Sequence, residues 1–272
     1  MNSRVTVLQI DNALASARIS LFGGQVLSFC PRHDQRERLF LSSKALLDGS
    51  KSIRGGVPIC WPWFGAWKGP VPQTGLPAHG YARTRGWEVV DINDHPHGTE
   101  VLLQMQDAKG PGFNGEAQVQ ALITVGHTLT VALYTTNKGS ESFNLGAALH
   151  TYFAVSDISQ TRLSGLTGTF SDKTRNWALA NTTTPYGFTA ETDRIHLDPA
   201  SQVDIVTNDL TTRVDSQGHD SVVVWNPWLE GSKAFVDLNA DDYRQFVCVE
   251  TALTQGYTLS PGQRHCLQQT IT

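Results

Sequence analysis

Residues 127–140 read HTLTVALYTTNKGS, and their pattern decides the expected fold class. Leu129, Val131 and Leu133 alternate with threonine or alanine, so an extended strand places the three apolar side chains on one face. The Asn-Lys-Gly sequence at 137–139 then supplies residues that favour a turn. The stretch therefore predicts a β-strand that ends at a reversal of the chain.

Short runs of the same kind recur along the chain, each bounded by Gly, Pro, Asn, Asp or Ser. They read TEVLLQMQ, AQVQALITV, SFNLGAALHTYFAV, DSVVVWNPW, KAFVDL and QFVCVETA. Helical periodicity is nearly absent, and strands do not alternate with helices as they do in a parallel doubly wound sheet. We therefore expect an all-β chain of large antiparallel sheets packed face to face, with few short helices.

No linker, repeat, charge run or low-complexity tract marks a boundary, so a single domain is expected over 1–272. Two regions, 50–86 and 171–194, interrupt the strand pattern and are expected to be loops. The segment SSKALLDGSK is expected to hold a short helix, with Ser42 or Ser43 as its N-cap.

The composition excludes several classes of partner. A net charge of −4 with 17% charged residues gives no basic footprint for nucleic acid or an anionic membrane surface. The first twenty residues lack a signal-peptide core, and no apolar stretch approaches the length of a membrane span. We expect a cytoplasmic monomer without nucleic-acid or membrane partners. Widely spaced cysteines predict buried thiols in preference to disulfides or a zinc site: Cys30, Cys60, Cys248 and Cys266.

Two arginines stand in Gly-, Pro- and aromatic-rich segments. Arg54 opens RGGVPICWPWFG, where the glycines let the backbone turn or approach a ligand closely and the aromatics could wall a pocket or join the core. Arg83 lies in GLPAHGYARTRGW, four residues after His79. Guanidinium groups donate paired hydrogen bonds to phosphate, so the arginines could form a phosphate clamp with His79 in the same pocket. Surface ion pairs are the alternative.

Two polar residues interrupt apolar strands. His150 lies within NLGAALHTYFAV, where an imidazole must find a partner or face a cleft. Glu250 lies within QFVCVETAL, on the same strand face as Phe246 and Cys248. Such groups suit proton transfer, whereas a satisfied core histidine and a buried ion pair are the structural alternatives. Asp193, in AETDRIHLD, is a third acid of interest, although the sequence alone favours a surface loop for it.

Other motifs give little support for other chemistries. His95 and His97 have a spacing that could suggest a metal, but the intervening proline and the lack of a further nearby ligand favour a turn. The chain contains no GxGxxG, P-loop, GxSxG or HExxH sequence, so nucleotide binding, serine hydrolysis of the elbow type and zinc proteolysis lose their main sequence support.

Six runs, taken together and in order, resemble the motifs of the glucose-6-phosphate 1-epimerases, or hexose-6-phosphate mutarotases, of the galactose-mutarotase-like superfamily. They read IRGGVPICWPWFG, GLPAHGYARTRGWEV, ALHTYFAV, ETDRIH, VVVWNPW and FVCVETA, and the resemblance extends from about residue 15 to the C-terminus. It implies a β-supersandwich with the sugar in a groove on one sheet, and no cofactor.

The resemblance also implies roles for five residues. His150 would be the general acid and Glu250 the general base, while Arg54 and Arg83 would bind the phosphate and the sugar. Asp193 would bind a sugar hydroxyl. The chain has Ala78 where the family often has glutamine, which leaves the substrate preference less defined.

The resemblance implies, as the expected function, anomer interconversion of a hexose 6-phosphate, most readily glucose 6-phosphate, and a histidine with a glutamate suits the proton transfers of that reaction. Aldose 1-epimerase activity on unphosphorylated sugars is the nearest alternative, and a carbohydrate-binding module on the same sandwich is another. A glycosidase ordinarily needs two carboxylates across the scissile bond, whereas here the partner of Glu250 in the resemblance is a histidine.

Overall fold

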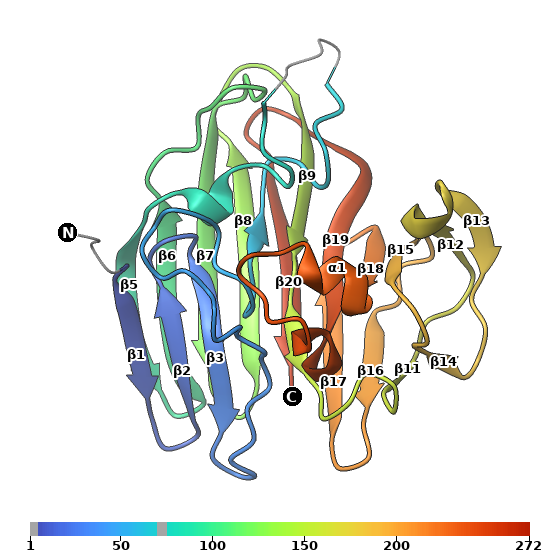
Figure 1. Cartoon of the computed structure of the whole chain (residues 1–272). Coiled ribbons are helices and arrows are strands. Elements are labelled where there is room, and N and C mark those ends of the chain that lie inside the picture. The colour runs from blue at the N-terminus through green and yellow to red at the C-terminus, as the bar shows by residue number, and fades with distance from the viewer. Residues whose placement is uncertain (1–4, 70–74) are drawn as a thin grey trace.

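A computed structural model describes residues 5–69 and 75–272, and within these residues the strands form three sheets of antiparallel pairs (Figure 1). The three-stranded sheet has the order β1 (Val7–Asp11), β2 (Ala15–Ser20), β3 (Gln25–Pro31). The eight-stranded sheet has the order β13 (Ala178–Asn181), β12 (Thr169–Asp172), β15 (Thr192–His196), β18 (Ser221–Asn226), β19 (Phe246–Leu259), β9 (Phe143–Leu149), β4 (Ile59–Cys60), and β10 (Tyr152–Ala154) also pairs with β19. The nine-stranded sheet has the order β14 (Tyr186–Gly187), β11 (Arg162–Ser164), β16 (Gln202–Val206), β17 (Thr211–Gln217), β20 (Arg264–Ile271), β8 (Leu129–Asn137), β7 (Ala117–Val125), β6 (Gly98–Met105), β5 (Trp87–His95).

Helices in the described residues are short, as expected. They are α1 (Trp228–Lys233) and the 3-10 turns η1 (Ala82–Thr84), η2 (Lys173–Arg175) and η3 (Asp242–Gln245). None of the described helices is long and apolar enough to cross a membrane. The antiparallel β-sandwich predicted from the alternating pattern is confirmed.

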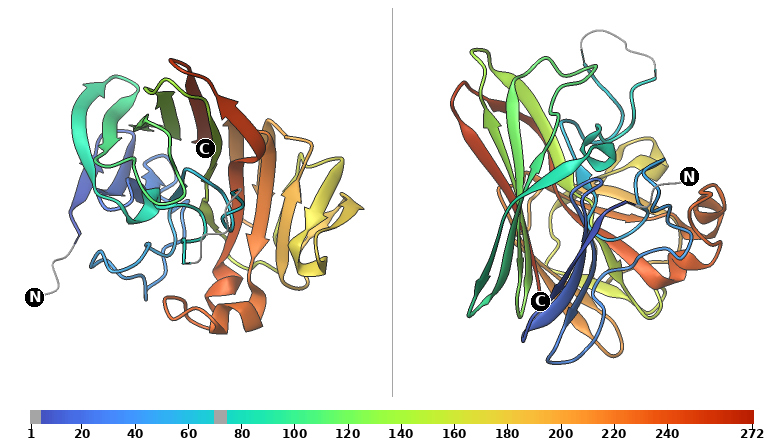
Figure 2. Two further views of the ribbon diagram at one scale, coloured as in Figure 1. Left: turned by 90° about the horizontal axis from the view of Figure 1, so that it is seen from above. Right: turned by 90° about the vertical axis from the view of Figure 1, so that its left-hand side faces the viewer.

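A single large apolar cluster joins all three sheets. It contains Ile19 of β2, Val131 of β8 and Val249 of β19, each no more than 2% exposed. Figure 2 shows the layers edge-on, with the nine-stranded sheet on one side of the core. Because side chains alternate along a strand, Val247 and Val249 face this core while Cys248 and Glu250 face the opposite side of the eight-stranded sheet.

The 127–140 stretch folds as its pattern predicts. β8 buries Leu129, Val131 and Leu133, and the strand ends at Asn137. The Asn137 side chain accepts a hydrogen bond from the Gly139 amide and donates to the carbonyls of Glu141 and Leu259. The amide side chain thus ties the turn after β8 to the end of β19.

The expected helix at 42–51 is wrong. The Ser42 hydroxyl accepts from the Lys44 amide, as an N-cap would, but it donates to the Asp242 carboxylate and the chain makes only a turn there. A second turn follows, in which the Ser50 amide donates to Asp48. The two side-chain-stabilised turns replace a helix because they offer the backbone alternative hydrogen bonds.

The loop expected at 171–194 is also wrong in part. Strands β12 and β13 form a hairpin around η2, and β14 and the start of β15 follow within the same region. β13 is the outermost strand of its sheet and is largely exposed, so it lacks the apolar alternation that would identify a strand. In the 50–86 region, β4 and η1 are the regular elements among the described residues, and 70–74 lie outside them.

All four cysteines are free thiols, in agreement with the sequence. Cys60 and Cys248 are buried, whereas Cys30 and Cys266 are half-buried, so the expected burial holds for two of them. His95 and His97 flank the turn between β5 and β6, as the proline between them indicated. Their rings stack 5.1 Å apart, and both contact Glu100 on the surface.

Candidate active site

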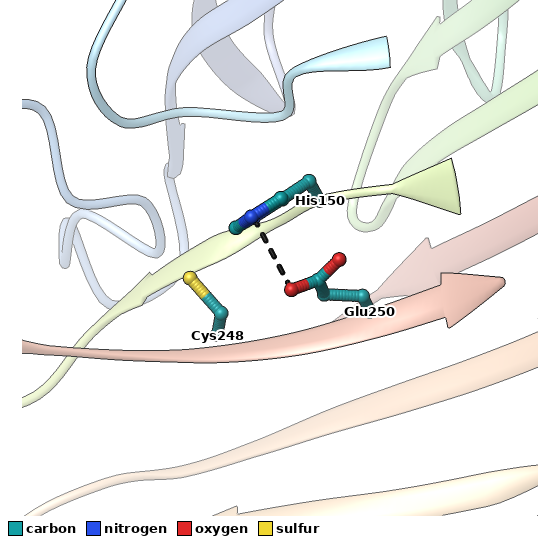
Figure 3. A group of neighbouring side chains, drawn as sticks. All are labelled: His150, Cys248 and Glu250. Carbon is teal, nitrogen blue, oxygen red and sulfur yellow. Dashed lines mark ion pairs between the residues drawn. The ribbon is translucent and has the colours of Figure 1, made fainter. Parts of the chain in front are cut away.

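His150 and Glu250 lie side by side on adjacent segments of the eight-stranded sheet. His150 directly follows β9, and the register of β9 with β19 places Leu149 opposite Thr251. The neighbouring residues therefore meet, and His150 Nδ1 lies 3.4 Å from Glu250 Oε1 (Figure 3). Two polar residues that interrupt apolar strands, one hundred positions apart in the sequence, are therefore in contact and form a candidate acid–base pair.

Both side chains are almost removed from solvent. The His150 side chain is 10% exposed and the Glu250 side chain 1% exposed. His150 Nδ1 and Glu250 Oε2 are buried polar atoms without a hydrogen-bond partner, and the 3.4 Å approach of Nδ1 to Oε1 is not counted as a hydrogen bond. Buried polar atoms are nearly always paired. The two unpaired atoms therefore indicate that a bound molecule supplies their hydrogen-bond partners.

The environment shifts the two pKa values in opposite directions. Burial raises the pKa of Glu250 well above its ordinary value, and the negative charge of Asp193 adds to this. Burial lowers the pKa of His150 well below its ordinary value, and the neighbouring His79 and Arg83 add to that shift. Burial therefore favours the state in which both groups are uncharged and the carboxyl holds the one proton of the pair.

A proton transfer within this coupled pair changes neither its total charge nor its proton count. With the proton on His150, the pair is a carboxylate base beside an imidazolium acid. With the proton on Glu250, it is a carboxylic acid beside a neutral imidazole. The pair can therefore take one proton from a bound molecule and give another back in the same step.

Arg54 is fixed by its surroundings. Its Nε lies 3.2 Å from the buried Asp237 carboxylate, its Nη1 donates to the Tyr152 hydroxyl at 3.0 Å, and its guanidinium packs 4.4 Å from the Phe235 ring centroid. Burial by itself lowers the pKa of Arg54, but Tyr152 and Asp237 outweigh it and raise the pKa above its ordinary value. Arg54 is thus a permanently charged and pre-oriented donor.

The two glycines after Arg54 allow close backbone packing. Gly55 and Gly56 have φ values of +117° and +65°. A Cβ on Gly55 would collide with the Phe40 carbonyl, and one on Gly56 with the Val26 carbonyl. The glycines therefore let the Arg54 segment pack closely against its neighbouring strands. They do not leave room for a ligand.

A pocket of about 470 Å³ brings Arg54 and Arg83 together, as the sequence suggested. Lys51 and Asp237 also line it. Arg83 Nη2 donates to the Ala78 carbonyl at 2.9 Å, which leaves its other guanidinium nitrogens for a ligand. Three cationic side chains and one carboxylate give the pocket a net positive charge suited to an anion.

Tyr152 connects this pocket to the acid–base pair. Its ring stacks on His150 with centroids 5.2 Å apart, while its hydroxyl accepts the hydrogen bond from Arg54. A single side chain therefore separates the basic pocket from the imidazole. Figure 3 shows His150 and Glu250 projecting toward one another from neighbouring strands.

His79 lies next to the pair. Its ring centroid is 5.6 Å from that of His150 and 4.7 Å from that of Phe64. Burial lowers the pKa of His79 to about 3, so the ring is neutral at physiological pH. Of the two outcomes that the sequence left open for the aromatics after Arg54, Trp61 joins the core, because it is fully buried and packs on Tyr81 and Phe113.

Asp193 lies on β15 and is not in a surface loop, which corrects the reading from sequence alone. Its carboxylate pairs with the Lys173 ammonium at 2.5 Å, and both side chains are partly buried. Burial raises the pKa of Asp193, and Lys173 opposes that shift. Asp193 and Lys173 both act electrostatically on Glu250, so they belong to the surroundings of the pair.

The sequence reasoning missed several members of this site. Lys173 directly follows Asp172, whose carboxylate accepts a hydrogen bond from the Thr174 amide and caps η2. The sequence around Lys173 therefore indicated only a capped turn and not a residue of the site. Tyr152 was part of a recognised motif but had no assigned role. Lys51 and Asp237 carried no signal at all, because only the folded chain brings them to Arg54.

Among the described residues, one group could hold a metal ion. His150, Cys248 and Glu250 each offer one ligand atom, and these atoms lie within 4.8 Å of one another.

A larger cavity of about 810 Å³ lies beyond the pair, between residues 62–69, the 112–116 loop and the β8–β9 turn. Neither His150 nor Glu250 lines that cavity.

Comparisons with known proteins agree with this geometry. A family model described as aldose 1-epimerase matches residues 6–272. A protein of Escherichia coli (strain K12) named "Putative glucose-6-phosphate 1-epimerase" is 34% identical over 253 residues, which cover 90% of this chain and 82% of that protein. A protein of the same name from Cenchrus ciliaris is 33% identical over 279 residues, covering 91% and 78%. The crystal structure of "a putative mutarotase" from Salmonella typhimurium is 32% identical and has a TM-score of 0.90, covering 98% of this chain and 90% of that chain.

Proposed function

Because the chain belongs to the aldose 1-epimerase family and is an isomerase of that kind, we propose that it interconverts the α and β anomers of a hexose 6-phosphate. Glucose 6-phosphate is the preferred substrate in this proposal. The observation that carries the phosphate preference is the basic pocket of Lys51, Arg54 and Arg83, which Tyr152 joins to His150.

The proposed reaction needs only proton transfers. The proton of the pair first moves from Glu250 to His150. Glu250 then takes the proton of the C1 hydroxyl while His150 donates its proton to the ring oxygen, so the C1–O5 bond breaks and an aldehyde forms. Rotation about C1–C2 presents the other carbonyl face. As O5 attacks C1, the proton of the O5 hydroxyl passes to His150 and O1 takes the proton held by Glu250. Transfer of the proton from His150 back to Glu250 restores the resting pair.

The phosphate would hold the sugar while its other end turns. Arg54 and Arg83 donate charge-assisted hydrogen bonds to the phosphate oxygens, and Lys51 adds a third positive charge. Binding energy at this remote group then fixes the position of C1 against Glu250. Asp193 accepts hydrogen bonds from sugar hydroxyls, and Lys173 holds its carboxylate in place.

Anomer exchange measured by NMR saturation transfer tests the proposal, with glucose 6-phosphate and glucose run in parallel. The expected result is faster exchange of the phosphate ester, with little effect on free glucose. Acceleration of free glucose alone would replace the proposal with an aldose 1-epimerase for unphosphorylated sugars. Binding of the phosphate ester without acceleration would indicate a carbohydrate-binding module.

The pH dependence of the rate should respond to Asp193. Its negative charge raises the pKa of Glu250, so Asp193→Asn removes that effect and leaves the opposing Lys173 charge unpaired. Both changes lower the pKa of Glu250, so the active pair loses its proton at a lower pH. We expect the alkaline limb of the kcat/KM profile to move to lower pH, whatever happens to KM.

Profiles of both proteins are measured by the same exchange experiment, after subtraction of the spontaneous rate at each pH. An alkaline limb at the wild-type position would contradict the assignment of the proton to the His150–Glu250 pair. Arg83 also faces Glu250 and remains in place in both proteins, so it does not contribute to the difference.

A further inference from the structure

Cys248 is a buried nucleophile beside the acid–base pair that the proposed reaction does not use. It precedes Glu250 by two positions on β19, so both side chains lie on the same face of the strand. Figure 3 shows its sulfur next to the His150 ring and the Glu250 carboxylate. The three potential ligand atoms lie within 4.8 Å of one another.

The geometry points to an inhibitory site for a soft divalent cation, Zn²⁺ or Cd²⁺, formed by His150, Cys248 and Glu250. The first support comes from unpaired atoms. His150 Nδ1 and Glu250 Oε2 are buried without hydrogen-bond partners. A cation between the side chains would satisfy His150 Nδ1, and a Glu250 carboxylate that binds it through both oxygens would also satisfy Oε2.

Distances provide the second support. Tetrahedral zinc with bonds of about 2.0–2.2 Å to nitrogen and oxygen separates those two ligand atoms by about 3.3–3.5 Å. His150 Nδ1 and Glu250 Oε1 are 3.4 Å apart. The nitrogen and oxygen already have the separation that the ion requires, and a rotation of the Cys248 side chain would complete the set.

Charge provides the third support. One thiolate and one carboxylate neutralise the two positive charges of the ion, and neutral imidazole adds none, so the bound set is uncharged. An uncharged set suits a site that excludes water. Two nearby cations are already paired, because Arg54 contacts Asp237 and Lys173 contacts Asp193.

Metal binding would stop proton transfer without altering the fold. The ion takes the lone pair of His150 Nδ1 and a carboxylate oxygen of Glu250. The Cys248 thiol and the Glu250 carboxyl each release one proton to solvent as their bonds to the metal form. Thiolate and imidazole ligands favour Zn²⁺ and Cd²⁺ over Mg²⁺, which prefers oxygen ligands. Inhibition should therefore be reversible by a chelator and selective for soft ions.

Calorimetry of the purified full chain with ZnCl₂ or CdCl₂ tests this site, together with the ultraviolet charge-transfer absorption of a cadmium–thiolate bond. We expect one ion per chain and a thiolate band in the wild-type protein. Cys248→Ser should lose the band and bind at least about 10-fold more weakly, since even the groups that orient metal ligands contribute 10- to 100-fold to affinity. MgCl₂ should produce no binding.

Cys60→Ser is the matched control, because Cys60 is also a buried free thiol but is not part of the group. It should bind the ions as the wild-type protein does. Equal binding by Cys248→Ser, loss of the band in Cys60→Ser, or no binding to the wild-type protein would each overturn the proposal. Should Cys248→Ser fail to fold, Glu250→Gln provides the same comparison, with weaker binding expected.

These binding measurements require no turnover, so they can fail or succeed independently of the proposed function. Where anomer exchange is observed, Zn²⁺ should suppress it in the wild-type and Cys60→Ser proteins. The same concentration should leave the Cys248→Ser rate unaffected. Equal suppression of all three would contradict an inhibitory role for Cys248.

Discussion

Glu250→Gln should lower kcat for anomer exchange by about 100- to 10,000-fold, the usual contribution of a general acid–base group. Glutamine nearly matches the shape of glutamate but cannot take the proton of the C1 hydroxyl. The carboxyl already holds its proton in the resting pair, since burial raises the pKa of Glu250. The uncharged amide should therefore be tolerated in the same buried position.

The measurement is saturation-transfer NMR on glucose 6-phosphate, with circular dichroism and thermal unfolding to establish that the variant is folded. Binding of the phosphate ester should persist, because the basic pocket is untouched. A folded variant with kcat within a few-fold of wild type would remove Glu250 from the mechanism. Loss of binding together with turnover would instead assign Glu250 to substrate recognition.

Arg83→Gln should raise KM for glucose 6-phosphate by about 10- to 100-fold, because a hydrogen bond to a charged group contributes about 1.5–3 kcal/mol. The effect on any residual exchange of free glucose should be small. Arg83 is a better target than Arg54, whose removal would leave the buried Asp237 without its partner and cost about 3–5 kcal/mol of stability.

Arg85→Gln is the control for this comparison. Arg85 lies two residues further on and contacts Asp107 and the Tyr81 ring, and it does not line the basic pocket. It should leave KM for the phosphate ester unchanged. Equal increases in KM for glucose and glucose 6-phosphate in the Arg83 variant would contradict the phosphate-binding role.

The sequence by itself determined the fold class and drew attention to the acid–base pair. Alternation over 127–140 was sufficient because a sheet with one buried face requires apolar residues at every second position. His150 and Glu250 were conspicuous because polar side chains in apolar strands are costly without a partner or a function. The strand β13 was missed because an exposed edge strand has no such alternation.

Only the tertiary structure decided which charged groups meet. Arg54 and Asp237 are 183 positions apart, and Ser42 and Asp242 are 200 apart. Cys248 joins His150 only because β9 and β10 both pair with β19 in a particular register. A local pattern specifies which face of a strand is buried, whereas the partner across the sheet depends on long-range pairing that no neighbouring residues encode. The unpaired atoms, the basic pocket and the three metal-binding atoms all follow from that pairing.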